Sequence, residues 1–174
     1  FSVRTSGLPN IGIQGVCFGN TLAALGPSVG RLSWGMIVWH ELAHVFHIQL
    51  SKSRVPRWFT EGLAEYESIV ARPEWQREEQ PALYDAYRRG RVPKLGSFNR
   101  AFTHVDHPRQ VTMAYFAASQ IAVHLADTKG PQIFAPMLRA WGAGKTTDAV
   151  IREVLAAEPE AVDRGFMGWL KPRM

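Results

Sequence analysis

The chain has 174 residues, of which 46% are hydrophobic, so a single compact domain can form a core without disulfide staples. The single cysteine, Cys17, excludes an internal disulfide and a multi-cysteine zinc site. The formal net charge is +5, but no binding motif accompanies the basic residues, so we expect no nucleic-acid partner. No apolar stretch is long enough to span a bilayer.

The N-terminal part of the chain predicts a small β-sheet region. Its first 30 residues are rich in glycine, proline and β-branched or aromatic residues. We expect short extended pieces around Val3 and Ile13, followed by a strand over residues 16–25 that ends at Gly26-Pro27. The exposed edge of this strand could bind an extended peptide.

The rest of the chain predicts helices. Apolar residues recur at helical spacing over residues 33–50, with Ser33 as a plausible N-cap. A second helix is expected over residues 57–70, directly after Pro56. Further helices are expected over residues 82–89, 106–127, 132–141, 147–156 and 160–170. A small sheet region followed by mostly helix predicts an α+β fold.

The first of these helices contains His40-Glu41-Leu42-Ala43-His44, which matches the pattern H-E-x-x-H. His40 and His44 lie one turn apart on the same face, so their rings can share one Zn²⁺ at about 2.0–2.1 Å. Glu41 is rotated by about 100° from His40, which places its carboxylate beside the ion as a possible proton acceptor. A chance match is the alternative, but the position within a predicted helix and the apolar neighbours favour a metal site.

A zinc site that leaves one position open for water needs a third protein ligand. His47 lies about 10.5 Å along the helix axis from the first histidine, so we expect it to pack rather than to coordinate. Glu61, seventeen residues after His44, is the better candidate, although it could also be a surface glutamate. Gly62 is a poor helix residue and suggests a close approach of another backbone. Glu65, one turn on, either hydrogen-bonds a ligand histidine or is a solvated charge.

These two segments resemble the gluzincin metallopeptidases, and most closely the peptidase MA-like domain of bacterial proteins, which often adjoins tetratricopeptide repeats. The similar motifs are His40-Glu41-x-x-His44, Trp58-Phe59-x-Glu61-Gly62-Leu63-Ala64-x-Tyr66, and, farther on, Ala114-Tyr115-x-Ala117-x-Ser119, Leu125 and Lys129-Gly130. The resemblance covers most of the chain, from about Gly15 onward. It implies Zn²⁺, a peptide or protein substrate, a thermolysin-like helical core behind a small sheet, and a possible adjoining tetratricopeptide-repeat region.

The resemblance also implies a catalytic role for Tyr115. Aminopeptidase-type gluzincins use a tyrosine after the third ligand to stabilise the oxyanion, and a phenol can donate such a hydrogen bond. Packing within a helix interface is the alternative for this tyrosine, and His104 and His107 are rival donors. The aminopeptidase recognition segment Gly-x-Met-x-Asn has no counterpart here, so both endopeptidase and exopeptidase activity stay open.

The sequence thus predicts one catalytic domain over residues 1–174, and the start at Phe1 suggests a piece of a longer protein. We expect a zinc metallopeptidase that hydrolyses peptide bonds through a water activated by the metal, with Glu41 as the general base. The alternatives are a non-catalytic zinc domain that binds peptides or supports assembly, and a metal hydrolase for other esters or amides. Because a purely structural site needs no base, Glu41 favours an enzyme. A cell-envelope or secreted location is favoured over a cytoplasmic one.

Overall fold

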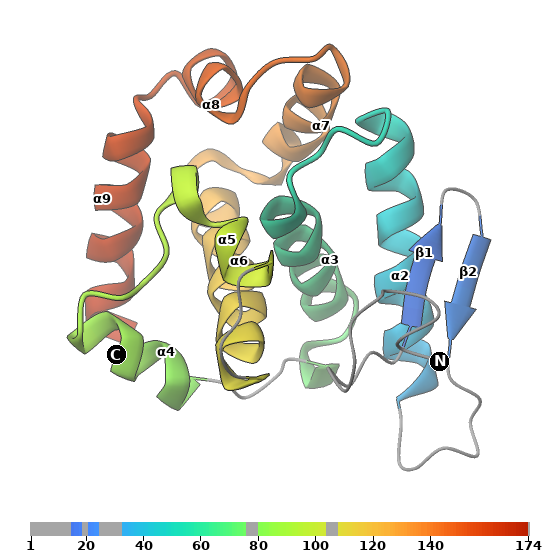
Figure 1. Cartoon of the computed structure of the whole chain (residues 1–174), viewed down its shortest axis with the longest axis horizontal. Coiled ribbons are helices and arrows are strands. Elements are labelled where there is room, and N and C mark those ends of the chain that lie inside the picture. Colours follow the sequence, from blue (N-terminus) through green and yellow to red (C-terminus); the bar gives the residue numbers. More distant parts are fainter. Residues whose placement is uncertain (1–14, 19–20, 25–32, 76–79, 104–107, 174) are drawn as a thin grey trace.

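The structure is a computed structural model that describes residues 15–18, 21–24, 33–75, 80–103 and 108–173 (Figure 1). In this part of the chain, a pair of short strands precedes a succession of helices. The strands are β1 (Gly15–Phe18) and β2 (Thr21–Ala24), and the helices are α2 (Trp34–Leu50), α3 (Arg57–Ala71), α4 (Gln80–Arg88), α5 (Arg100–Thr103), α6 (Pro108–Lys129), α7 (Phe134–Gly142), α8 (Thr147–Leu155) and α9 (Pro159–Leu170).

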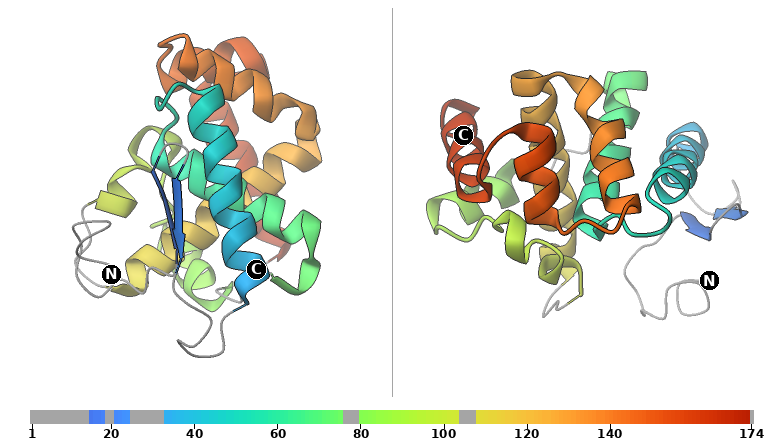
Figure 2. Two further views of the ribbon diagram at one scale, coloured as in Figure 1. Left: turned by 90° about the vertical axis from the view of Figure 1, so that its right-hand side faces the viewer. Right: turned by 90° about the horizontal axis from the view of Figure 1, so that it is seen from above.

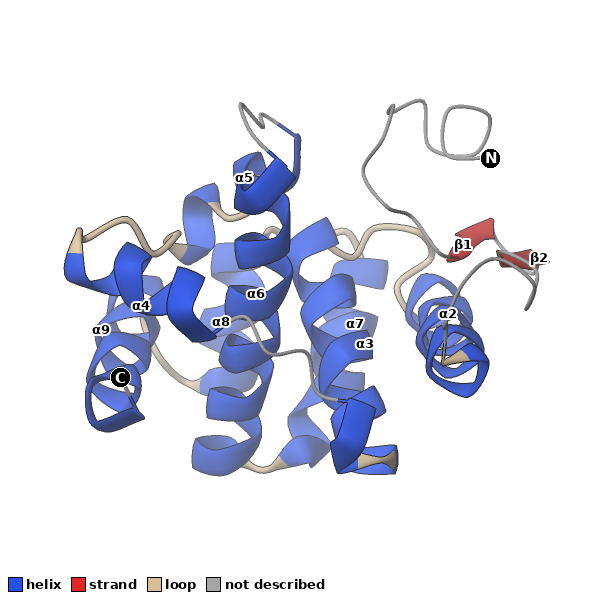
Figure 3. Cartoon of the chain, turned by 90° about the horizontal axis from the view of Figure 1, so that it is seen from below, coloured by secondary structure: helices blue, strands red, loops and turns tan. Residues whose placement is uncertain are grey.

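The α+β fold class expected from the sequence is wrong. About 80% of the described part is helical, and its strands form only one short pair at the edge of the molecule (Figure 3). Two strands of this length provide no layer on which a helical body could pack. The described part of the chain is therefore mainly helical.

The single strand predicted over residues 16–25 is also wrong. β1 and β2 pair with each other in antiparallel fashion, so that Gly15 lies opposite Ala24 and Phe18 opposite Thr21. The extended pieces predicted around Val3 and Ile13 lie outside the described residues.

The two helices that carry the candidate ligands have the bounds that the sequence predicts to within about one residue. Ser33 occupies the N-cap position of α2, although its side chain makes no capping hydrogen bond. After α2, Lys52 and Ser53 adopt positive φ angles of 49° and 61°, which reverse the chain so that α3 runs back along α2. Arg54 Nη1 donates to the carbonyl oxygen of Gly142 at 2.7 Å and thereby ties this turn to the end of α7.

The core lies around α3 and α6, which run side by side in the middle of the molecule (Figure 1). A Cβ atom on Gly62 would lie only 2.3 Å from the backbone oxygen of Ala118, so the close backbone approach predicted from this glycine is confirmed. The buried hydrophobic side chains that these two helices contribute to the core include Trp58, Phe59, Leu63, Ala114, Ala117 and Ile121. None of the helices in the described part is both long and apolar enough to cross a membrane.

Helix α2 lies at one side of this core, with α3 on one flank and the β1–β2 pair on the outer flank (Figure 2). Apolar side chains on α2 such as Trp39, Leu42 and Phe46 are 42–59% exposed. Its buried residues are mainly ionisable and comprise Ile37, His40, Glu41, Ala43, His44 and His47. α2 therefore meets α3 through a polar face, and this interface holds the candidate site.

Candidate metal centre

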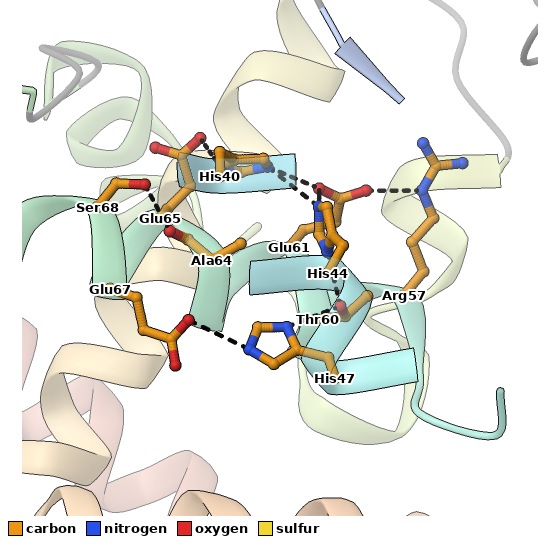
Figure 4. Close-up of polar contacts among 10 residues, drawn as sticks. All are labelled: His40, His44, His47, Arg57, Thr60, Glu61, Ala64, Glu65, Glu67 and Ser68. Atoms are coloured by element: carbon orange, nitrogen blue, oxygen red, sulfur yellow. Dashed lines mark hydrogen bonds and ion pairs between the residues drawn. The ribbon is translucent and has the colours of Figure 1, made fainter. Parts of the chain in front are cut away.

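Three side chains from α2 and α3 converge at the interface between the two helices (Figure 4). The Nε2 atoms of His40 and His44 are 3.1 Å apart. Glu61 Oε2 lies 3.5 Å from the Nε2 atom of His40 and 3.3 Å from that of His44. All three residues are buried, with 8–9% of their surface exposed. The structure therefore brings together the three candidate ligands named from the sequence.

The spacing of these three atoms matches a tetrahedral zinc site. Ligand atoms at about 2.0–2.1 Å from a tetrahedral ion lie roughly 3.3 Å from one another. The three separations here are 3.1, 3.3 and 3.5 Å. Two imidazoles and one carboxylate are also a ligand set that zinc prefers, and three protein ligands leave a fourth position open. His40, His44 and Glu61 could therefore hold Zn²⁺ between them.

The charges at this cluster also favour a bound cation. Burial opposes ionisation of Glu61, but the two histidines act against it and hold the pKa of this carboxyl well below its usual range. Burial likewise opposes a charge on His44, but the carboxylates of Glu61 and Glu41 raise the pKa of His44 above its usual value. The negative charge of Glu61 thus favours a positive charge at the two histidines, and a bound divalent ion would supply that charge.

Glu41 lies on the same buried side of α2 and is only 7% exposed. Burial raises the pKa of its carboxyl group, an effect that the neighbouring His44 and His40 partly offset and that Glu61 reinforces. A glutamate with a raised pKa is a better proton acceptor than an ordinary surface carboxylate. The arrangement thus provides a buried carboxyl group that interacts electrostatically with the cluster but lies outside it.

The outer nitrogens of both rings face polar groups of α3. His40 Nδ1 lies 3.5 Å from Glu65 Oε1, and because Glu65 is only 5% exposed, the solvated alternative considered for this residue is wrong. His44 Nδ1 lies 2.8 Å from the hydroxyl oxygen of Thr60. Such contacts fix the tautomer and orientation of a histidine whose other nitrogen binds a metal. Sequence reasoning missed Thr60, because only the packing of α3 against α2 brings this hydroxyl to the histidine.

His47 does not join the cluster, which confirms the expectation that it packs rather than coordinates. It is 2% exposed, and its Nδ1 atom lies 3.1 Å from the hydroxyl oxygen of Thr60. Its Nε2 atom faces Glu67 Oε2 at 3.3 Å. Burial lowers the pKa of His47, although Glu67 acts in the opposite direction, so the ring is neutral near pH 7.

The second oxygen of Glu61 faces an arginine. Arg57 Nε approaches Glu61 Oε1 at 3.4 Å, while the other oxygen, Oε2, faces the two histidines (Figure 4). The guanidinium group of Arg57 also hydrogen-bonds the hydroxyl of Tyr115 and lies over the ring of Phe102. Tyr115, on α6, is thus linked to the candidate ligand Glu61 through Arg57. The centroid of its ring lies 5.1 Å from that of Phe102.

His104 and His107, the rival donors considered from the sequence, lie outside the described residues. Within the described part, His40, His44 and Glu61 form the one group of three or more histidine, cysteine, aspartate or glutamate side chains close enough to hold a metal ion. No known protein family, curated protein or solved structure matches the chain, so the residues of this site are the basis on which its function is inferred.

Proposed function

We propose that the chain is a zinc-dependent metallopeptidase that hydrolyses peptide bonds. The observation that supports this most strongly is the convergence of His40 Nε2, His44 Nε2 and Glu61 Oε2 to within 3.5 Å of one another. The buried carboxyl group of Glu41 interacts electrostatically with all three residues. A closed structural zinc site normally has four protein ligands. Three ligands and an adjacent base are the arrangement of a hydrolytic site.

In this proposal His40, His44 and Glu61 bind the zinc ion and hold it at the interface between α2 and α3. When bound, zinc polarises the carbonyl group of the substrate and makes water more acidic. Arg57 keeps the Oε1 atom of Glu61 turned away from the histidines, which favours binding of the ion through Oε2 alone.

Glu41 carries the proton in this mechanism. Its carboxylate accepts a proton from the attacking water and then delivers it to the amine that leaves when the peptide bond breaks. The raised pKa that burial gives Glu41 suits both steps, because the group must gain and then lose the same proton. Tyr115 remains the candidate donor to the oxyanion. Its hydroxyl group interacts with Arg57, which in turn interacts with the candidate ligand Glu61.

The test compares zinc-loaded wild-type protein with the variant Glu41→Gln on a diverse mixture of peptides, with the products read by mass spectrometry. Because positioned acid–base groups contribute about 10²–10⁴-fold, we expect turnover to fall by that factor while zinc content stays the same. Glu160→Gln, at an exposed position in the first turn of α9, is the matched control and should retain full turnover.

The outcomes separate the candidate functions. Equal product from the wild type and Glu41→Gln would overturn the peptidase proposal, because the base would then have no part in the reaction. Stoichiometric zinc without cleavage of any peptide would favour a non-catalytic zinc domain. Cleavage of ester or amide substrates, but not of peptides, would favour a different metal hydrolase.

A further inference from the structure

A connected set of polar side chains leads from the candidate ligand His44 to the protein surface. His44 Nδ1 lies 2.8 Å from Thr60 Oγ1, and this same oxygen lies 3.1 Å from His47 Nδ1. On the other side of the His47 ring, Nε2 faces Glu67 Oε2 at 3.3 Å. The side chain of Glu67 is 40% exposed, so the set begins at the buried cluster and ends in solvent (Figure 4).

The donors and acceptors along this path can follow one continuous direction when His44 binds a metal. Because Nε2 must then offer its lone pair to the ion, the proton of His44 resides on Nδ1 and is donated to the Thr60 oxygen. The single hydroxyl proton of Thr60 is then available to His47 Nδ1, which lies 3.1 Å from this oxygen. The proton of His47 then resides on Nε2, where it faces the carboxylate of Glu67. His44 and Thr60 each donate to the next member, whereas His47 Nε2 lies at ion-pair distance from the Glu67 carboxylate without the geometry of a hydrogen bond.

The burial of His47 needs an explanation that packing alone does not provide. A ring at 2% exposure with two polar nitrogens is costly unless both nitrogens have partners, and an apolar side chain would fill the same space at lower cost. His47 cannot share an ion with His40, because the two lie about 10.5 Å apart along the helix axis. Its contacts instead lead to Thr60 and, through Thr60, to the ligand His44.

We propose that His47 and Glu67 are positioning residues that act through Thr60 to hold His44 with its Nε2 lone pair toward the metal. Glu67 fixes the tautomer of His47, His47 directs the hydroxyl of Thr60, and Thr60 accepts the Nδ1 proton of His44. This inference rests on the proposed function, because the tautomers follow from a metal ion on His44 Nε2.

The first test measures zinc affinity by competition with a chromogenic chelator, so it does not depend on activity. Loss of such an outer partner typically weakens metal binding by about 10–100-fold, and we expect Thr60→Val to do so. Thr60→Ser keeps the hydroxyl and should bind zinc nearly as tightly as the wild type. Thr128→Val, which removes a hydroxyl from α6 that bonds the backbone oxygen of His124, is the matched control and should leave zinc affinity unchanged.

The second test asks whether His47 acts through Thr60. We expect His47→Leu to weaken zinc binding, and we expect the double variant Thr60→Val/His47→Leu to bind zinc no more weakly than Thr60→Val alone. A general loss of packing would instead add the two effects. Additive losses, or zinc affinity in His47→Leu equal to that of the wild type, would overturn the proposal.

The third test uses the wild-type protein loaded with zinc, so its result stands even if a variant fails to fold. Imidazole ¹⁵N shifts, recorded at a pH above the titration range of both rings, report which nitrogen carries the proton. We expect Nδ1–H for His44 and Nε2–H for His47. An Nδ1–H tautomer of His47 would make this ring a donor to Thr60 instead of an acceptor and would overturn the inference, whereas the peptidase proposal would stand or fall by its own assay.

Discussion

Replacement of Gly62 by alanine tests how the central pair of helices fixes the site. The new Cβ atom would lie 2.3 Å from the backbone oxygen and 2.6 Å from the carbonyl carbon of Ala118. Both atoms belong to the backbone of α6, so no side-chain rotation can relieve the contact. Restoring an ordinary separation requires α3 and α6 to move apart by roughly 1 Å.

The magnitude follows from two opposing effects. Overpacking of a well-packed core costs about 1–3 kcal/mol, and contact between two backbones belongs at the upper end of this range. Against this, alanine in a helix interior is favoured over glycine by about 0.8–1.0 kcal/mol. We therefore expect Gly62→Ala to lower the free energy of unfolding by about 2 kcal/mol, and the melting temperature by about 4–8 °C for a chain of this size.

The matched control is Gly168→Ala in α9, where an added Cβ atom meets nothing within 4 Å. The same chemical change should raise the free energy of unfolding there by up to about 1 kcal/mol. Urea unfolding followed by circular dichroism measures both variants. Zinc affinity should also fall in Gly62→Ala, because Glu61 is the adjacent residue and moves with α3. Equal or greater stability of Gly62→Ala would refute the close packing of α3 on α6.

Two further predictions concern a tyrosine and a buried histidine. Tyr115→Phe should lower peptide turnover sharply while zinc stays bound, and unchanged turnover would remove this hydroxyl from the mechanism. For His124, burial lowers the pKa, with Asp127 opposing and Arg173 adding to this effect. Below about pH 6.5 the histidine therefore binds a proton more readily in the unfolded chain than in the folded protein. As the pH falls, the free energy of unfolding thus decreases by at most about 1.4 kcal/mol per pH unit for this group. Urea unfolding across this range should show a shallower fall for His124→Gln, and parallel curves for the two proteins would contradict the assignment.

The sequence predicts the two site helices well because their signals are local. Helical spacing of apolar residues defines α2, and Pro56 marks the start of α3. The convergence of His40 and His44 also follows from one turn of helix geometry. To place Glu61 near the histidines, the prediction also had to assume that the chain reverses between the two helices. The positive φ angles of Lys52 and Ser53 produce this reversal.

The errors arise where pairing or packing decides the structure. The prediction of one strand over residues 16–25 overlooked Gly19-Asn20, a two-residue combination that typically separates the strands of a hairpin. The α+β class assumed that the N-terminal region forms a sheet layer, whereas the described strands form only one short pair beside a mainly helical body. Thr60 and Glu67 carry no sequence signal of their own, because their contacts with His44 and His47 depend on the rotation of α3 against α2.

The polar interface between α2 and α3 would couple binding of the proposed ion to the packing of α2 against α3. The helix that carries both histidines buries few apolar side chains, so hydrophobic burial contributes little to its docking. If the proposed ion binds here, its binding energy is also the energy that fastens this helix to the rest of the molecule. Removal of the ion would then loosen the packing of α2 as well as abolish hydrolysis.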